Sequence, residues 1–321
     1  CEMLLSGVTT YVDMSYPYPG WTDTVAQSGI RAFLSPLFDS AKTAATNDHA
    51  LEYRWAEDGG SADFEAAVKL LDAADDHPSG RLSAMMSPMT VDTCTPELLR
   101  RAHDMATERN WPYHLHAGMS VIEFHEMVKR TGQTSIQWAH DQGLLGRNTI
   151  IGHGAVLDHH SWVHWHTKDD IDILANSGAS VSHCPVVLSR YGVTLESFGR
   201  YRKADINLGI GTDCHPHNML EEIREAAIMS RVSDQHMFSA LTADVFDAAT
   251  VGGAKALLRD DIGRLSQGAK ADIVVVDVTN PMMLPLYDPL RSLIFSQAVW
   301  FLYFQSTLSA AEAVMLYAIA D

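Results

Sequence analysis

Tyr113-His-Leu-His-Ala117 is a short run that predicts a β-strand with two histidines near its carboxyl end. Side chains alternate along a strand, so His114 and His116 would point to the same face, and His116 would lie nearer the carboxyl end. The pair could bind a metal, or it could be two interior histidines that hydrogen bonds satisfy. Amphipathic stretches at 96–109 and 120–130 predict a helix on either side of this strand.

The same alternation of short apolar runs and helical patterns extends in both directions. Strands are also predicted at 8–13, 30–37, 82–89, 149–153, 179–183 and 206–211, and helices at 21–28, 62–74, 168–176, 196–203 and 220–230. Strands separated by helices predict parallel β-α-β units. The fold class is therefore α/β, and seven such strands fit an eight-stranded TIM-like (β/α)8 barrel that lacks its first strand.

Three segments are expected along the chain. Residues 1–260 are expected to form the barrel, including two more helical patterns at 239–248 and 251–258. Within residues 261–295, a polar, glycine-containing turn leads into Asp272-Ile-Val-Val-Val-Asp277, which indicates the remnant of a small β-sandwich domain. Residues 296–321 form an apolar tail with a helical tendency.

The composition excludes several classes of partner. The formal net charge is −17, so the chain has no broad attraction for nucleic acid or for an anionic membrane surface. No apolar run reaches the roughly 18 residues that a membrane span needs.

The four cysteines form no C-x-x-C pair, which favours a reducing cytoplasm over a disulfide framework. The sixteen histidines are a first indication of metal or proton chemistry.

Three further predicted strands end in residues that can bind a metal or move a proton. In Ile150-Ile-Gly-His153 the glycines are expected to turn the chain sharply and expose the imidazole at the rim, with a structural histidine as the alternative. The strand ending Val181-Ser-His183 offers either a substrate contact or a packed histidine. The strand ending Ile210-Gly-Thr-Asp213 offers either a metal-binding carboxylate or a helix cap. Barrel enzymes place their active sites at the carboxyl ends of strands. The ordered set therefore indicates a divalent metal that activates water for hydrolysis.

Other histidines are expected to play smaller parts. The pairs His159-His160 and His164-Trp-His166 lie in the loop after the predicted strand 149–153 and are expected on a solvated rim. The pair in His215-Pro-His217 follows Asp213 closely, and two alternatives stay open: the two histidines line the pocket, or they lie outside it.

At these motifs the chain resembles the amidohydrolase superfamily, over about residues 2–295. The branch that it resembles contains the cytosine and guanine deaminases, the adenosylhomocysteine deaminases and the triazine hydrolases. Besides the four strand ends, the resemblance is carried by Glu2-Met-Leu-Leu-Ser-Gly-Val-Thr-Thr10, Met219-Leu-Glu-Glu-Ile-Arg224 and Gly268-Ala-Lys-Ala-Asp272.

The resemblance implies one divalent metal, with zinc expected and iron as the alternative, bound by His116 and Asp213. It also implies catalytic roles for His153, which would assist the water or the substrate, and for Asp213, which would pass a proton to the leaving group. We expect His114, His183 and Glu222 to contact the substrate. That substrate would be a small nitrogen heterocycle that loses an amine, or a halide, by hydrolysis, and the protein would be a homodimer.

Three departures from the family pattern support another interpretation. No His-x-His precedes Val8, so an N-terminal segment with two more metal ligands is expected to be missing. Met119 stands where the deaminases carry a glutamate, so Glu123 or another group would have to donate the proton. The tail 297–321 does not resemble the family's return to the small β-domain. The alternative is therefore a catalytically incompetent barrel fragment, or a binding protein without a metal.

Overall fold

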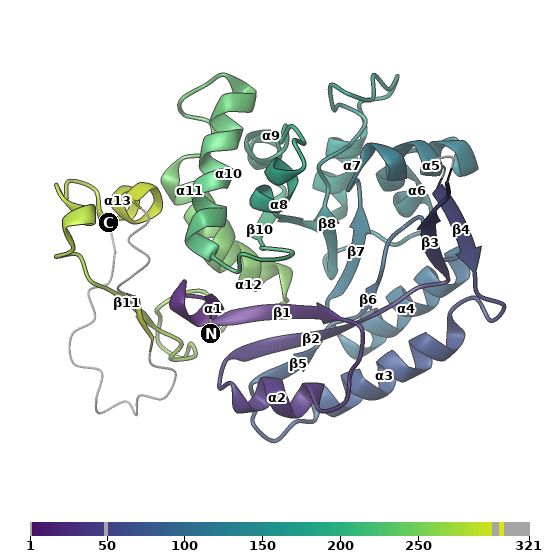
Figure 1. Cartoon of the computed structure of the whole chain (residues 1–321), viewed down its shortest axis with the longest axis horizontal. Helices are drawn as coiled ribbons and strands as arrows, with labels where there is room; N and C mark the ends of the chain where they lie inside the picture. Colours follow the sequence, from purple (N-terminus) through teal and green to yellow (C-terminus); the bar gives the residue numbers. More distant parts are fainter. Residues whose placement is uncertain (1, 48–50, 297–301, 305–321) are drawn as a thin grey trace. The chain divides into compact units, whose positions relative to one another are not determined.

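The computed structural model describes residues 2–47, 51–296 and 302–304 (Figure 1). The chain divides into two compact units, one made of Thr10–Val181 and the other of Cys1–Thr9 together with Ser182–Asp321. Strand β9 (Ser180–His183) is the segment in which the chain passes from the first of these units to the second. No helix in the described ranges is long and apolar enough to cross a membrane.

The Thr10–Val181 unit begins with a parallel sheet. Strand β2 (Arg31–Phe38) lies between β1 (Thr10–Ser15) and β5 (Leu82–Ala84), and β6 (Ser87–Pro88) pairs with the end of β2. The predicted strand 82–89 is thus split in two. The split arises because the chain changes neighbours: Met85 donates its N–H to Leu34 on β2, whereas Met86 donates to Pro112 and pairs with Tyr113.

Two helices cover one face of this sheet, α2 (Trp21–Gln27) and α3 (Ser61–Asp75) (Figure 1). Alternate residues of β2, Ala32 and Leu34, point to that face, as the period of a strand requires. They join an apolar cluster with side chains of both helices and of β5, namely Trp21, Val25, Ala74 and Leu82. The intervening residues Phe33 and Ser35 therefore point to the opposite face, which is also buried.

A second parallel pair in the same unit carries the histidines. Strand β7 (Tyr113–Ala117) follows α4 (Pro96–Arg109) and pairs with β8 (Thr149–His153), in a register that places His116 opposite Gly152. Both strands have the bounds predicted from the sequence. Helices α5 (Val121–Thr131) and α6 (Ser135–Asp141) connect them, and α7 (Asp170–Ser177) leads to β9.

Several elements were not predicted. The antiparallel hairpin of β3 (Ala41–Ala45) and β4 (Leu51–Trp55) is mostly exposed, so it has no apolar periodicity that could reveal it. Helices α6 and α8 (Pro185–Arg190) are at most two turns long, which is too short for a helical pattern to emerge.

The second unit consists mainly of helices, together with the end of β9 and strand β10 (Asn207–Ile210). Gly211 donates its N–H to the carbonyl of His183 (3.0 Å), which joins the chain after β10 to the end of β9. The long helix α10 (Met219–Asp234) packs against α8 and against further helices at Phe198–Lys203 (α9), Thr242–Asp247 (α11) and Pro289–Ser296 (α13). A π-helical turn (η1, Ala248–Gly252) leads into α12 (Gly253–Ala256), and α1 (Glu2–Leu5) lies in the same unit.

The end of the described chain differs from its prediction at one place. Strand β11 (Val274–Val276) lies within the predicted β-segment, a 3-10 turn follows at Pro281–Met283, and β11 pairs antiparallel with β12 (Leu302–Phe304). The helical tendency predicted for the tail is therefore wrong at 302–304, where the partner strand overrides the local preference. The rest of the tail, 297–301 and 305–321, lies outside the described residues.

Parallel sheets and alternating helices agree with the predicted α/β class. Within residues 2–47, 51–296 and 302–304 the strands do not form a closed barrel. The segment boundaries at residues 260 and 295 stay predictions.

Candidate functional site

Three histidine rings lie together on β7 and β8. The ring centroids of His114 and His116 are 4.6 Å apart, and those of His116 and His153 are 5.5 Å apart. His116 is partly exposed, whereas His114 and His153 are buried. The expectation that the imidazole of His153 is exposed at the rim is therefore wrong. Its backbone has φ 69°, a left-handed conformation that is uncommon outside glycine.

His116 is held in one orientation. Its Nδ1 lies 2.5 Å from the carbonyl oxygen of Met89, in the chain that follows β6. Because a carbonyl oxygen can only accept a hydrogen bond, Nδ1 carries the proton and Nε2 keeps its lone pair. This is the arrangement in which metal-binding histidines are commonly oriented by a backbone carbonyl.

The ring of His114 packs against His116 and against Gly152. A Cβ atom on Gly152 would lie 2.6 Å from Cε1 of His114 and 2.7 Å from its Nε2, so a larger residue here would force the ring to shift. Burial and the neighbouring imidazoles of His116 and His153 hold the pKa of His114 well below its usual range. His114 is therefore neutral, and its Nδ1 has no hydrogen-bond partner among the described residues.

Glu123 is committed to the backbone of the loop after β7. Its carboxylate accepts hydrogen bonds from the N–H groups of Gly118 (2.8 Å) and Met119 (2.7 Å) and from the hydroxyl of Ser135. Burial raises the pKa of Glu123 to about 7, and the hydrogen bonds act against that rise. All of these contacts hold the turn that follows His116, so Glu123 is not placed as a free proton donor in place of Met119.

In the second unit, the predicted residues Asp213 and His183 differ in their surroundings. Asp213 is exposed and has φ 59°, a left-handed conformation that is uncommon outside glycine and is often found at functional sites. His183 is buried with its ring 5.8 Å from that of Phe198, and burial lowers its pKa to about 4. Of the two alternatives for His183, this packing favours the packed histidine.

Glu222 is buried on α10 and reaches the start of α8. Its Oε2 accepts a hydrogen bond from the N–H of Val186 (3.0 Å). Burial raises the pKa of Glu222 to about 8, although the bond from Val186 lowers it. Glu222 thereby fixes the turn directly after His183 and Cys184.

The whole chain was compared with known proteins. Residues 1–304 match the model of the amidohydrolase family. This chain belongs to the amidohydrolase family. It is 30% identical over 304 residues to a 5-methylthioadenosine/S-adenosylhomocysteine deaminase of Halobacterium salinarum, a match that covers 92% of this chain and 64% of the relative. The chain thus spans less than two thirds of the length of that curated relative.

Solved structures share the amidohydrolase fold with this chain. An adenosine deaminase from Xanthomonas campestris with bound zinc has a TM-score of 0.78 and 27% identity, covering 92% of this chain and 63% of that one. An atrazine chlorohydrolase from Arthrobacter aurescens, complexed with zinc, has a TM-score of 0.76 and 22% identity, covering 91% and 65%. At that lower identity the second likeness shows the fold alone.

The donors of this amidohydrolase chain suit a divalent metal only in part. A neutral imidazole that is protonated at Nδ1 and carries its lone pair on Nε2, as in His116, is a common zinc ligand. Within 2–47, 51–296 and 302–304, however, no three His, Cys, Asp or Glu side chains are grouped so that they could hold an ion. His116 and Asp213 belong to different units, and their assignment as metal ligands stays a prediction.

The loop histidines only partly follow expectation. His164 and His166 are exposed, as predicted for a solvated rim, but His160 is buried and its Nδ1 accepts a hydrogen bond from the N–H of Trp162 (3.2 Å). His217 lies 3.2 Å from the hydroxyl of Thr212 through Nδ1. These contacts shape the loops.

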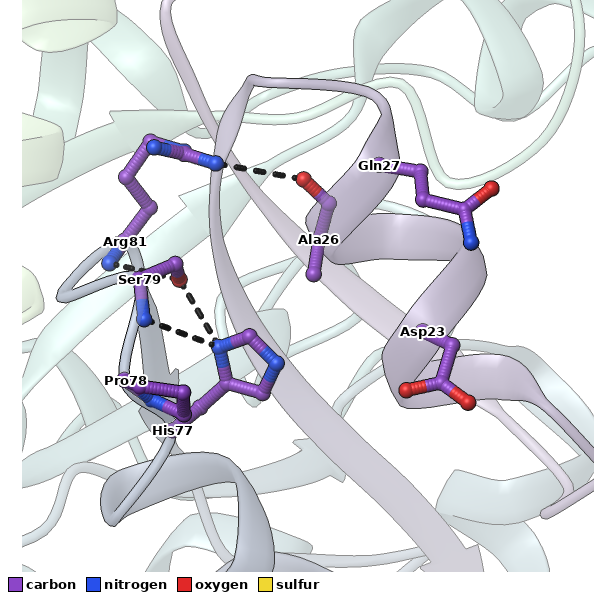
Figure 2. A pocket seen from close by; sticks show the side chains of 7 residues that line it. All are labelled: Asp23, Ala26, Gln27, His77, Pro78, Ser79 and Arg81. Carbon is purple, nitrogen blue, oxygen red and sulfur yellow. Dashed lines mark hydrogen bonds between the residues drawn. The ribbon is translucent and has the colours of Figure 1, made fainter.

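A hollow of about 500 Å³ lies elsewhere in the Thr10–Val181 unit (Figure 2). It is lined by residues of α2 and of the loop that leads from α3 to β5, so it lies at the amino end of β5. Figure 2 shows His77 bonded to Ser79 (2.9 Å) and Arg81 bonded to the carbonyl of Ala26 (3.2 Å). These polar groups join neighbouring loops, and none of the predicted site residues lines the hollow.

Sequence reasoning missed the residue that orients His116. The Met89 carbonyl lies 27 residues before His116 in the chain, and its role depends on the backbone. Thr90 forms a bridge with His116, which brings the carbonyl into place. No side-chain motif could have indicated it.

Proposed function

We propose that this chain belongs to a metal-dependent hydrolase that removes an amino group from a nitrogen heterocycle. The observation that carries the proposal is His116, whose Nδ1 donates to the Met89 carbonyl, so that the lone pair of the neutral ring lies on Nε2, the nitrogen proposed as the metal donor. Family membership and the relatives named as adenosine-type deaminases support it. Among heterocycles, we propose an aminopurine, because those relatives carry purine nucleosides in their names.

The metal would be zinc, with iron as the alternative, and His116 and Asp213 are proposed as ligands. When bound, a divalent metal supplies the Lewis acidity that makes water nucleophilic near neutral pH. The zinc bound in the adenosine deaminase structure supports this choice.

The chain's own residues would move the protons. We propose that His153 orients or deprotonates the attacking water, and that Asp213 carries a proton to the departing amine. The oxygen of water forms a bond to the ring carbon, the C–N bond breaks, and ammonia leaves with the transferred proton. His114, His183 and Glu222 are proposed to shape the substrate side of the site.

A direct assay tests this proposal. Purified 321-residue chain, loaded with zinc, is expected to release ammonia from 5′-deoxyadenosine or 5′-methylthioadenosine, and His153→Ala is expected to lower kcat by about 10²–10⁴-fold. The control is His164→Ala, which removes an exposed loop histidine and should leave kcat unchanged. Absence of ammonia release from every aminopurine tried, with zinc bound, would contradict deamination.

One observation favours a second candidate. Met119 cannot donate a proton, and the Glu123 carboxylate is occupied by the N–H groups of Gly118 and Met119. A substrate that loses halide needs no acid, so hydrolysis of a ring C–halogen bond is the alternative reaction. A catalytically incompetent or metal-free binding protein is the other alternative. Chloride release from a chlorotriazine without ammonia release would favour the former, and substrate binding without turnover the latter.

We also propose a more detailed fold, an oligomeric state and a location for this protein. The fold would be a TIM-like (β/α)8 barrel with the remnant of a small β-domain near 261–295, the protein would be a homodimer, and its location would be cytoplasmic. These proposals rest on the sequence and on the resemblance.

A further inference from the structure

We infer that Tyr53 and Arg130 are positioning residues for His116, acting through the segment Met89–Asp92. This inference rests on the proposed function, because it gives these residues a role through a proposed metal ligand. The carbonyl of Met89 accepts a hydrogen bond from Nδ1 of His116 at 2.5 Å. Whatever fixes that carbonyl also fixes the tautomer and the orientation of the imidazole.

The segment after β6 is tied to two strands at its beginning. Met89 donates its N–H to the carbonyl of Phe38 at the end of β2 (2.8 Å). Val91 donates its N–H to the carbonyl of His116 on β7 (3.0 Å). The segment therefore runs directly beside His116, and a shift of its far end would change the distance from the Met89 carbonyl to Nδ1.

The far end of the segment is held from outside the sheet. The hydroxyl of Tyr53, on strand β4, donates to Oδ2 of Asp92 at 2.6 Å. The guanidinium of Arg130, on α5, donates through Nη1 to the backbone carbonyl of Asp92, also at 2.6 Å. Asp92 is buried, and both contacts reach it from elements distant in the chain.

The two residues that hold Asp92 also hold each other. The guanidinium of Arg130 lies over the ring of Tyr53, 4.2 Å from its centroid, and over the ring of Trp55 at 5.2 Å. Its Nε donates to Glu126 on the same helix at 2.7 Å. A cation placed on two aromatic faces and two oxygens has little freedom, so it makes a firm support.

The contacts with Arg130 also stabilise the β3–β4 hairpin itself. Strands β3 and β4 form a sheet of two strands, and an isolated two-stranded hairpin is marginally stable in water. Tyr53 and Trp55 are on the strand that faces Arg130. The hairpin, the Met89–Asp92 segment and α5 therefore meet at Asp92, and each follows the carboxyl end of a different strand, β2, β6 and β7.

The test measures the tautomer of His116 directly, in the metal-free chain at pH 8. With ¹⁵N-labelled histidine, NMR distinguishes a protonated Nδ1 from a protonated Nε2, and the His116 signals are identified by their loss in His116→Gln. The wild type is expected to show the Nδ1–H form. In Tyr53→Phe and in Arg130→Met, the Nε2–H form should become detectable, and the affinity for zinc alone should fall by about tenfold.

A matched control separates positioning from general loosening. Arg109 stacks over Trp111 at 5.1 Å and pairs with Asp72, so Arg109→Met removes the same kinds of contact away from Met89. This control should leave the His116 tautomer as in the wild type. An unchanged tautomer in both test variants, an equal change in Arg109→Met, or a wild type already in the Nε2–H form would overturn the inference.

Tyr53→Phe removes one hydroxyl and keeps the ring, so it decides the question even if Arg130→Met fails to fold. The outcome is independent of turnover. If the wild type releases no ammonia but the tautomer responds, the proposed function fails and the positioning role stands. If the wild type is active and the tautomer does not respond, the positioning role alone fails.

Discussion

A side chain at Gly152 would meet the ring of His114, because a Cβ there would lie 2.6 Å from its Cε1. Gly152→Ala is expected to lower the free energy of unfolding by about 1–3 kcal/mol and to displace His114 toward His116. Urea denaturation measures the first effect. Gly209→Ala, in strand β10, is the control, since a Cβ there would lie at an ordinary 3.7 Å from Cα of Gly253. Equal losses from the two substitutions would contradict the packing described for His114.

Glu123 makes stability depend on pH. Burial raises its pKa in the folded state to about 7, above the ordinary value of 4.5, so folding favours the protonated form. Its contribution is fully present below pH 4.5 and is lost as the pH rises through 7, which amounts to on the order of 3 kcal/mol at most. Glu123→Gln cannot titrate, so its stability relative to the wild type should improve between pH 5 and pH 8. Parallel stability curves for the two proteins would show that Glu123 does not titrate in this range.

At the scale of elements, the loop between β8 and α7 is fastened by two buried carboxylates. Asp158 accepts hydrogen bonds from the hydroxyl of Thr167 (2.9 Å) and from the N–H of Asp169 (2.6 Å), while Asp170 accepts one from the N–H of Asp158 (2.9 Å). Between Asp158 and Asp169 the loop contains His160, His164, Trp162 and Trp165. It should therefore be rigid at its base.

Asp158→Ala is expected to release this loop and to lower the free energy of unfolding by about 1–3 kcal/mol, because the buried donors would lose their acceptor. Hydrogen exchange followed by mass spectrometry should show faster exchange in residues 159–169. Asp172→Ala, an exposed carboxylate on α7, is the control and should leave that exchange unchanged. Unchanged exchange in Asp158→Ala would mean that other contacts hold the loop.

The sequence was most informative about the elements that are buried. Strands β7 and β8 are buried and have the predicted bounds, and so has helix α4. The hairpin β3–β4 was missed because its side chains are mostly exposed. Strand 302–304 was missed because its partner, β11, lies far along the chain and decides its conformation. Local pattern therefore predicts the buried elements and fails where pairing with a distant segment decides.

At the scale of the whole molecule, the sequence predicted the amidohydrolase family, which the match over residues 1–304 confirms, whereas metal binding by the residues that end successive strands stays a prediction. The strand ends place His116 and His153 together, with rings 5.5 Å apart. The sequence could not predict the backbone groups that hold these side chains in place. The tautomer of His116 depends on a backbone carbonyl, and the role of Glu123 depends on two backbone amides, neither of which has a side-chain signature.

Zinc stoichiometry decides whether His116 is a metal ligand, as the proposed hydrolase function requires. The purified 321-residue chain is dialysed against zinc, freed of excess ion, and analysed for metal by mass spectrometry beside His116→Gln and the exposed control His166→Gln. One zinc per chain is expected in the wild type and in His166→Gln, and a large loss of zinc is expected in His116→Gln. A wild type without zinc, or His116→Gln with as much zinc as the wild type, would contradict the assignment of His116 as a metal ligand.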